Sequence, residues 1–295
     1  AGAYGESSPV IMITGYPSTS QQASGQAWHH MLGAHRYDLF VDMAEHLTVA
    51  RAVLTPENCL EEFERVLAAV IYHQKPGLLA FPSDLGHKPI TGSSPESVPL
   101  ANPQSDPAAL KQAVDHIVSM ISGVSPTCII PGFMVQRLGL RSLATELVDA
   151  TNLPFATPYQ DVTTLDETHP NCMGVWQGEF SNPAINEFIE SCQYVLALAP
   201  ERHFFNTGFN TITFEQERSI NIYAHRVRVG RAIYDNIEMK DVLPLLIERL
   251  PRWGDLGAPN HVTPYTEASG GGDDPIDGGK PLYARLQQFL RPNDI

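Results

Sequence analysis

Short apolar runs alternate with amphipathic stretches along the chain, as they do in α/β proteins. The first apolar run, residues 10–14, lies between Ser-Pro and Gly-Tyr-Pro and predicts a buried parallel strand. Further strands are predicted near residues 47–53 and at residues 78–84. Between these two strands, a helix is predicted with Thr55 as its N-cap and Pro56 as its first residue. The inward face of this helix carries apolar residues at helical spacing: Leu60, Phe63, Leu67 and Val70.

A second series of strands and helices begins at Asp106, an N-cap followed by Pro107. Strands are predicted at residues 127–132, 154–158, 194–200 and 219–225. Helices with inward apolar faces are predicted near residues 110–121, 143–148, 185–192 and 239–250. In the last of these, we expect Pro244 to be tolerated only in the first turn, because proline has no N–H to donate. Strands that alternate with helices in this way predict a doubly wound parallel sheet.

Polar stretches rich in Gly, Pro and Ser divide the chain. They predict a first α/β portion, a linker, a complete α/β domain, a flexible linker and a single amphipathic helix, at residues 1–90, 91–105, 106–252, 253–280 and 281–295. A long surface loop is the alternative to the first linker. One helix cannot bury its apolar face alone, so we expect the last segment to dock on another part of a larger assembly.

The composition of the 295 residues bounds the class of protein. A formal net charge of −14 argues against a nucleic-acid or anionic-membrane partner, since both need clustered Lys and Arg. No apolar run approaches the roughly 20 residues of a membrane helix, and no secretory signal opens the chain, so we expect a cytoplasmic protein. The cysteines form no CxxC pair, which favours reduced core thiols over disulfides or a metal site: Cys59, Cys128, Cys172 and Cys192.

Two adjacent histidines, His29 and His30, follow the first strand and its Gly-, Pro- and Ser-rich turn. Such a loop is where α/β sheets place ligands, outside the carboxyl ends of the strands. Neighbouring residues on a helix diverge by about 100°, so both imidazoles can face one crevice only in a loop or at a helix end. Imidazole titrates near neutral pH and therefore suits proton transfer. The simpler alternative is a pair of surface histidines.

The sequence around this pair, GYPSTSQQASGQAWHHMLG at residues 15–33, resembles the thiamine diphosphate-dependent 2-oxoacid decarboxylases, in their pyruvate and indolepyruvate decarboxylase branch. That family has a strand, a G-x-P-S-T turn and a tandem His-His. Further stretches match it in order along the chain, at residues 54–67, 75–84, 153–158, 165–178, 205–209, 227–243 and 281–295. The resemblance therefore covers nearly all of the sequence.

The resemblance implies a partial pyrimidine-binding domain at residues 1–90, a middle domain at 106–252 and the first helix of a diphosphate-binding domain at 281–295. It implies that His29 and His30 assist substrate binding and proton transfer. It also implies that the complete protein binds thiamine diphosphate and Mg²⁺, acts on a small-molecule 2-oxoacid and forms a homodimer or homotetramer.

The departures from the family limit what this chain is expected to do alone. The segment that supplies the cofactor-activating glutamate and the diphosphate motif are not in the sequence, so no cofactor-binding residue and no metal ligand is assigned, and the isolated chain is expected to be inactive. Residues 34–38 replace the usual Asp-Gly-Asp-Phe-like segment, and Phe204 stands where the family has Asp.

Two other functions stay open at this point. One is a non-catalytic binding or regulatory relative that retains the middle domain, and the other is an acetolactate synthase-like carboligase, whose middle domain binds flavin. The intact histidine pair favours the decarboxylase over both. The remaining polar candidates are interpreted as structural: Asp166, Glu167 and His169 as a loop of the middle domain, and His35 and His46 as surface residues. Trp28 either lines the substrate pocket or packs beneath the loop.

Overall fold

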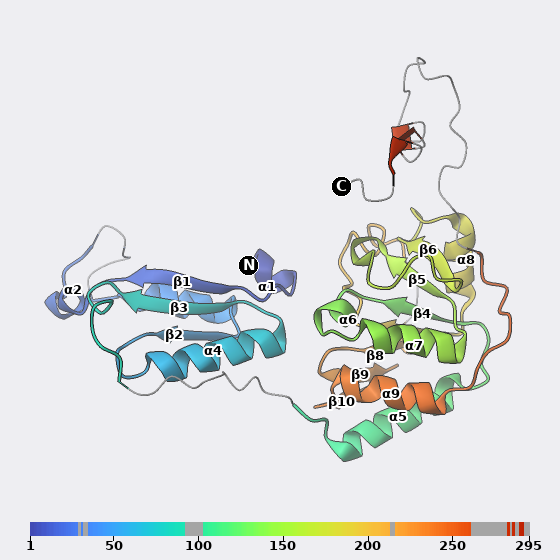
Figure 1. Ribbon diagram of the computed structural model, residues 1–295, viewed down its shortest axis with the longest axis horizontal. Coiled ribbons are helices and arrows are strands. Elements are labelled where there is room, and N and C mark those ends of the chain that lie inside the picture. The colour runs from blue at the N-terminus through green and yellow to red at the C-terminus, as the bar shows by residue number, and fades with distance from the viewer. Residues whose placement is uncertain are drawn as a thin grey trace. The chain divides into compact units, whose positions relative to one another are not determined.

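The computed structural model describes residues 1–28, 31, 35–91, 103–212 and 216–260, with 282, 283, 285, 286 and 289–291 (Figure 1). Within these residues the chain divides into two compact units, residues 1–103 and residues 104–295, each with its own sheet. No helix in the described ranges is long and apolar enough to span a membrane. Most of the predicted linker at 91–105, and most of the stretch at 253–280, lie outside the described residues.

The first unit is built on a three-stranded parallel sheet with the strand order β1-β3-β2. The strands are β1 (Ile11–Tyr16), β2 (Ala50–Val53) and β3 (Gly77–Pro82). The helices are α1 (Gly2–Gly5), α2 (Thr19–Ser24), α3 (Leu39–Met43), η1 (Ala44–His46) and α4 (Cys59–His73). Helix α4 covers one sheet face with Val66 and Val70, which are fully buried against Leu79.

Two local expectations for this unit were wrong. Helix α4 begins at Cys59 rather than at Pro56, because Thr55 and Asn58 hold each other in a turn: Asn58 N donates to Thr55 Oγ1 and Thr55 N donates to Asn58 Oδ1, at 3.2 and 2.7 Å. Strand β1 is parallel as expected, but it is the edge strand of the described sheet and is not buried. Met12 and Ile13 are 62% and 68% exposed.

The second unit is a seven-stranded sheet with the order β10-β9-β8-β7-β4-β5-β6. The strands are β4 (Thr127–Pro131), β5 (Phe155–Pro158), β6 (Cys172–Trp176), β7 (Tyr194–Leu198), β8 (Ser219–Ile222), β9 (Arg226–Val229) and β10 (Ala232–Asp235). The main helices are α5 (Pro107–Ile121), α6 (Met134–Arg137), α7 (Arg141–Thr151), α8 (Pro183–Ser191) and α9 (Met239–Arg249), with 3-10 turns η2 (Tyr159–Asp161) and η3 (Gln216–Arg218). The predicted α/β fold with parallel sheets is confirmed.

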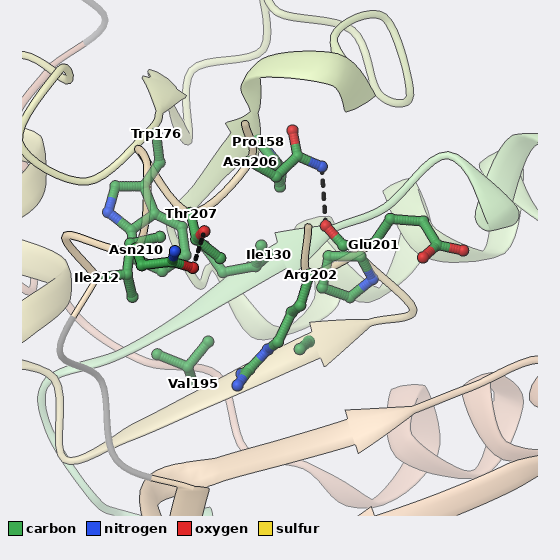
Figure 2. Close-up of a pocket in the computed structure, with 12 residues that line it drawn as sticks. Ile130, Pro158, Trp176, Val195, Glu201, Arg202, Asn206, Thr207, Asn210 and Ile212 are labelled. Atoms are coloured by element: carbon green, nitrogen blue, oxygen red, sulfur yellow. Dashed lines mark hydrogen bonds between the residues drawn. The ribbon is translucent and has the colours of Figure 1, made fainter. Parts of the chain in front are cut away.

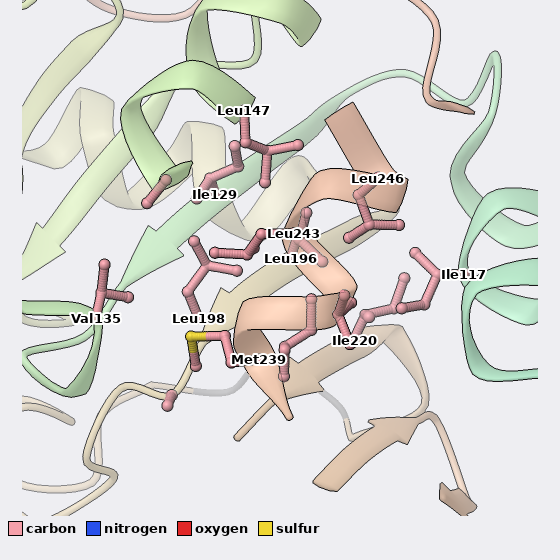
Figure 3. Packing of buried hydrophobic residues seen from close by; sticks show 14 of the residues in the cluster. Ile117, Ile129, Val135, Leu147, Leu196, Leu198, Ile220, Met239, Leu243 and Leu246 are labelled. Carbon is pink, nitrogen blue, oxygen red and sulfur yellow. The ribbon is translucent and has the colours of Figure 1, made fainter. Parts of the chain in front are cut away.

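Alternating residues of the central strands fill two cores. On one face, Ile129 and Leu196 pack against α5, α7 and α9, and Figure 3 shows Leu147, Leu243 and Leu246 from these helices converging on them. On the other face, strand residues pack under α8: Cys128, Ile130, Ala156, Met173 and Val195. A parallel sheet buried on both faces accounts for the near-continuous apolar strands in the sequence.

Three features of this unit differ from expectation or were not foreseen. Strand β6 and the antiparallel hairpin β9–β10 were not predicted, because runs of only four or five residues are too short to establish a strand period. Pro244 lies in the middle of α9 and not in its first turn. The helix continues past it because Val242, Leu243 and Leu246 are buried in the core, and that packing outweighs the one missing hydrogen bond.

A buried carboxyl group, Asp161, joins the loops at the carboxyl edge of the second sheet. Phe133 N, in the loop after β4, donates to Asp161 Oδ1 at 3.1 Å. Asn206 Nδ2, in the segment after β7, donates to Oδ2 at 3.1 Å, and Thr164 Oγ1 donates to the Asp161 carbonyl at 2.6 Å. Desolvation, with a smaller contribution from Glu201, raises the pKa of Asp161 to about 7 despite these hydrogen bonds.

Asp161 therefore predicts a pH-dependent stability. Because folding raises its pKa above the unfolded value of about 3.9, its stabilising contribution is complete below that value and is lost as the pH rises through 7. We expect this group to reduce the free energy of unfolding by about 2–3 kcal/mol between pH 5 and pH 8. Denaturant unfolding of the parent chain and of Asp161→Asn at both pH values measures the difference. Equal pH dependence in the two proteins would contradict it.

The cysteines allow a second prediction. Cys128, Cys172 and Cys192 are buried, in line with the expectation of core thiols, and Cys59 is half-buried. Burial raises the pKa of the Cys172 thiol to about 11, and the pKa of Cys128 is also raised, by its contact with Cys192 and by desolvation. A disulfide reagent at pH 8 should modify Cys59 rapidly and the other three only after unfolding. In Cys59→Ser no fast phase should remain; two fast thiols in the native protein would overturn the assignment.

Candidate functional site

The loop that follows β1 is fixed by a capping box at the start of α2. Gln21 N donates to Ser18 Oγ at 3.1 Å, and Ser18 N donates to Gln21 Oε1 at 2.9 Å. The reciprocal pair satisfies amide groups that a helix N-terminus otherwise leaves without partners. The G-x-P-S-T turn therefore begins a short helix at the carboxyl end of β1.

Asp84, which follows β3, ties this loop to the neighbouring strand. Its Oδ1 accepts from Thr19 N at 3.0 Å and its Oδ2 accepts from Thr19 Oγ1 at 2.5 Å. These two hydrogen bonds lower the pKa of the Asp84 carboxyl, so it is ionised at neutral pH. Because β1 and β3 are parallel neighbours, both of their carboxyl ends lie at one edge of the sheet.

The two ends of the next segment are also held together. Gly25, with a φ of +64°, ends α2, and an added Cβ there would lie 2.1 Å from the His35 ring. Tyr37 Oη donates to the Gln26 carbonyl at 2.7 Å. In the sequence, His29 and His30 lie between the residues that make these contacts; both histidines are outside the described residues.

The residues that flank the histidine pair are described. Met31 N donates to the Trp28 carbonyl at 2.9 Å. The half-buried Trp28 carries its indole Nε1 in a buried position, with no hydrogen-bond partner among the described residues. A buried donor of this kind is costly unless another group accepts its hydrogen bond.

Met31 also lines a pocket of about 350 Å³ on the sheet face opposite α4. Its walls come from β1 and from the segment that includes α3, among them Thr14, Tyr16, Tyr37 and Phe40. Desolvation, aided by Asp38 and Asp42, raises the pKa of Tyr16, so this phenol stays protonated at neutral pH. The chain next to the histidine pair thus borders a largely apolar pocket whose lining includes three residues with hydroxyl groups, Thr14, Tyr16 and Tyr37.

The other polar candidates have structural roles. Asp166 accepts from Thr168 N and Oγ1 at 2.9 and 2.7 Å, Glu167 accepts from Thr163 N at 3.1 Å, and His169 Nε2 lies 3.0 Å from Asp149 Oδ1. Asp166, Glu167 and His169 therefore each bind a different neighbour. Among the described residues no group of three His, Cys, Asp or Glu side chains could hold a metal ion. His35 and His46 are exposed, as expected.

Thr19, Asp84 and Tyr37 were not singled out from the sequence. Asp84 was within reach of sequence reasoning, because an acidic residue directly after a buried strand lies at the edge where the first loop also lies. Tyr37 was not, since its contact with Gln26 bridges a segment without a regular pattern.

Comparison with known proteins shows what the second unit is similar to. Residues 114–250 match the family model of the thiamine pyrophosphate enzyme central domain. The chain is 27% identical to the alpha-keto-acid decarboxylase of Mycobacterium leprae over 98% of its length, and 28% identical to the pyruvate decarboxylase of Aspergillus fumigatus over all of it. It covers 49% and 52% of those proteins, so it spans about half the length of these curated relatives.

A solved structure supports the fold. Benzoylformate decarboxylase from Polynucleobacter necessarius superposes with a TM-score of 0.64 at 17% identity, covering 90% of this chain and 49% of that one. The resemblance found from the sequence motifs is thereby confirmed. Residues 114–250 thus match a thiamine pyrophosphate enzyme central domain, in a chain that is similar along its length to pyruvate and alpha-keto-acid decarboxylases.

Proposed function

We propose that this chain is part of a thiamine diphosphate-dependent non-oxidative decarboxylase that converts a 2-oxoacid to an aldehyde and CO₂. The observation that carries the proposal is the fixed loop after β1. Its capping box and its two hydrogen bonds to Asp84 fix the start of α2 at the carboxyl edge of a parallel sheet, and His29 and His30 follow α2 in the sequence. The relatives named as decarboxylases support the same activity.

His29 and His30 are the proposed catalytic residues. An imidazole can hold and release a proton near neutral pH, so the pair can bind the substrate carboxylate and return a proton to the product. Thiamine diphosphate, when bound, supplies the electron sink for the carbon–carbon bond cleavage. The pocket beside Met31 would take the side chain of the 2-oxoacid, pyruvate or an aryl or branched pyruvate.

The cofactor and Mg²⁺ are assigned to the complete protein. The described residues of this chain supply no cluster of metal ligands, and the buried Trp28 Nε1 has no acceptor among them. A donor in this position fits a site that is completed by groups from elsewhere in the protein or by its ligand. We therefore propose that the chain is inactive alone and that the active enzyme is a homodimer or homotetramer.

The proposal predicts a strong effect of the histidines in the complete enzyme. With thiamine diphosphate and Mg²⁺ added, decarboxylation of pyruvate or phenylpyruvate should fall by about 10²- to 10⁴-fold in His29→Ala or His30→Ala, the range that a positioned proton-transfer group contributes. His46→Ala is the matched control, because His46 is an exposed histidine of the same unit, and it should retain parent activity.

Two results would contradict the proposal. Full activity in both histidine variants would remove the pair from the mechanism. Absence of aldehyde from every 2-oxoacid tested, in a complete protein that binds the cofactor, would favour a non-catalytic relative; acetolactate formation and bound flavin would identify a carboligase instead. Turnover by the 295-residue chain alone would refute the claim that it is incomplete as an enzyme.

A further inference from the structure

The second unit contains a cavity of about 140 Å³ that no part of the proposed decarboxylation uses (Figure 2). It lies over the carboxyl-terminal part of the sheet, since Pro158 and Trp176 are the last residues of β5 and β6 and Pro200 follows β7. The strand order reverses between β4 and β7, and open α/β sheets bind ligands outside the carboxyl ends at such a point.

The walls of the cavity are mainly apolar. The apolar residues that line it are Ile130, Pro158, Trp176, Val195, Ala197, Pro200 and Ile212. An apolar cavity of about 150 Å³ is known to accept benzene, so this one has room for roughly one aromatic ring or branched alkyl group. The Trp176 ring is held in place because its Nε1 donates to Asn186 Oδ1 at 3.1 Å.

The segment after β7 closes the cavity and is firmly seated. Gly208 has a φ of +55°, and an added Cβ there would lie 2.2 Å from the Gln177 carbonyl oxygen, so glycine is required. Asn206 is buried and donates to both Asp161 Oδ2 and the Glu201 carbonyl, at 3.1 and 2.9 Å. The cavity is thus preformed.

One cation lines this apolar space. Figure 2 shows the Arg202 side chain extending along the cavity to Val195, while the Glu201 carboxylate points the other way. Arg202 Nη2 donates to Ser219 Oγ at 2.9 Å, and no carboxylate among the described residues pairs with this guanidinium. Although Arg202 is exposed as a whole, desolvation of its guanidinium lowers its pKa, and nearby Arg228 lowers it further against an opposing effect of Tyr223.

A guanidinium has five N–H donors, and its fork fits carboxylate and phosphate groups. The Arg202 guanidinium donates to a neutral hydroxyl and has a second arginine near it, so its charge would be stabilised by an anion. Asn210, at the same cavity, adds an amide group that contacts Thr207 Oγ1 at 3.4 Å.

We propose that this cavity binds a small organic anion, whose ring or branched chain fills the apolar part and whose carboxylate or phosphate is bound by Arg202. All of the residues that line it belong to the second unit, whereas the proposed catalytic histidines belong to the sequence of the first. Its ligand class follows from two features: a guanidinium that is paired with no carboxylate among the described residues, and room for a single apolar group.

The three tryptophans of the chain make the proposal testable by NMR. The indole N–H signals of the ¹⁵N-labelled chain, assigned with Trp176→Phe, are followed during titration with phenylacetate, phenylphosphate and the neutral phenylacetamide. We expect a saturable shift of the Trp176 signal with either anion, and a dissociation constant at least about tenfold higher for the amide. The signal of Trp253, whose Nε1 donates to Val124 O in the other core, should not move. Whichever of phenylacetate and phenylphosphate binds more tightly shows whether Arg202 prefers a carboxylate or a phosphate.

Arg202→Gln should weaken binding of the preferred anion about tenfold and leave the amide unchanged. Arg226→Gln is the matched control, because Arg226 is an exposed arginine of the same unit that does not line the cavity. A Trp253 signal at the parent position shows that each variant is folded. The proposal fails if neither anion shifts Trp176, if the amide binds as tightly as the anions, or if the two arginine variants behave alike.

Discussion

One constraint acts on both units: the strands of a parallel sheet carry apolar side chains on both faces, so both faces must be covered. In the central domain the requirement is met. Residues of β4 and β7 alternate between the core under α5, α7 and α9 and the core under α8. In the first unit, α4 covers one face of β3, whereas Met12 and Ile13 of β1 are more than half exposed within the described structure. The burial of each sheet thus depends on how many of its strands are covered by helices on both faces.

The sequence predicted the elements whose local chemistry and packing agree. Helices α5 and α8 begin where Asp106 and Asn182 place an N-cap before a proline, and the side chains accept from Ala109 N and Ala184 N. Where local chemistry and tertiary packing disagreed, the prediction failed. Pro244 is unfavourable inside a helix by local rules, yet the buried residues around it keep α9 continuous. Thr55 and Pro56 satisfy the rules for a helix start, but the turn closed by Asn58 delays it.

The candidate sites divide in the same way. The histidine pair was found because a family motif lies in one contiguous stretch, and its role stays a prediction. The Arg202 cavity could not be found from the sequence, since its walls come from four strands and one long segment that only the fold brings together. Asp161 was missed for a related reason: its raised pKa arises mainly from burial, with a smaller contribution from Glu201, and the segments that bury it are distant from it in the sequence. The spacing of residues reveals a motif that lies within one stretch of sequence. Cavities and pKa shifts depend on residues that only the fold brings together.

Asp84 and Asp161 show how the environment gives opposite pKa shifts to two aspartates at equivalent places in their sheets. Each carboxyl group joins loops at the carboxyl edge of a parallel sheet by accepting two hydrogen bonds. Asp84 is only half-buried, so the hydrogen bonds from Thr19 dominate and its pKa falls; Asp161 is fully buried, so desolvation dominates and its pKa rises. The start of α2, after β1, is therefore anchored by a group that stays charged throughout the neutral range. The segment that closes the central-domain cavity is anchored by a group that changes its charge there.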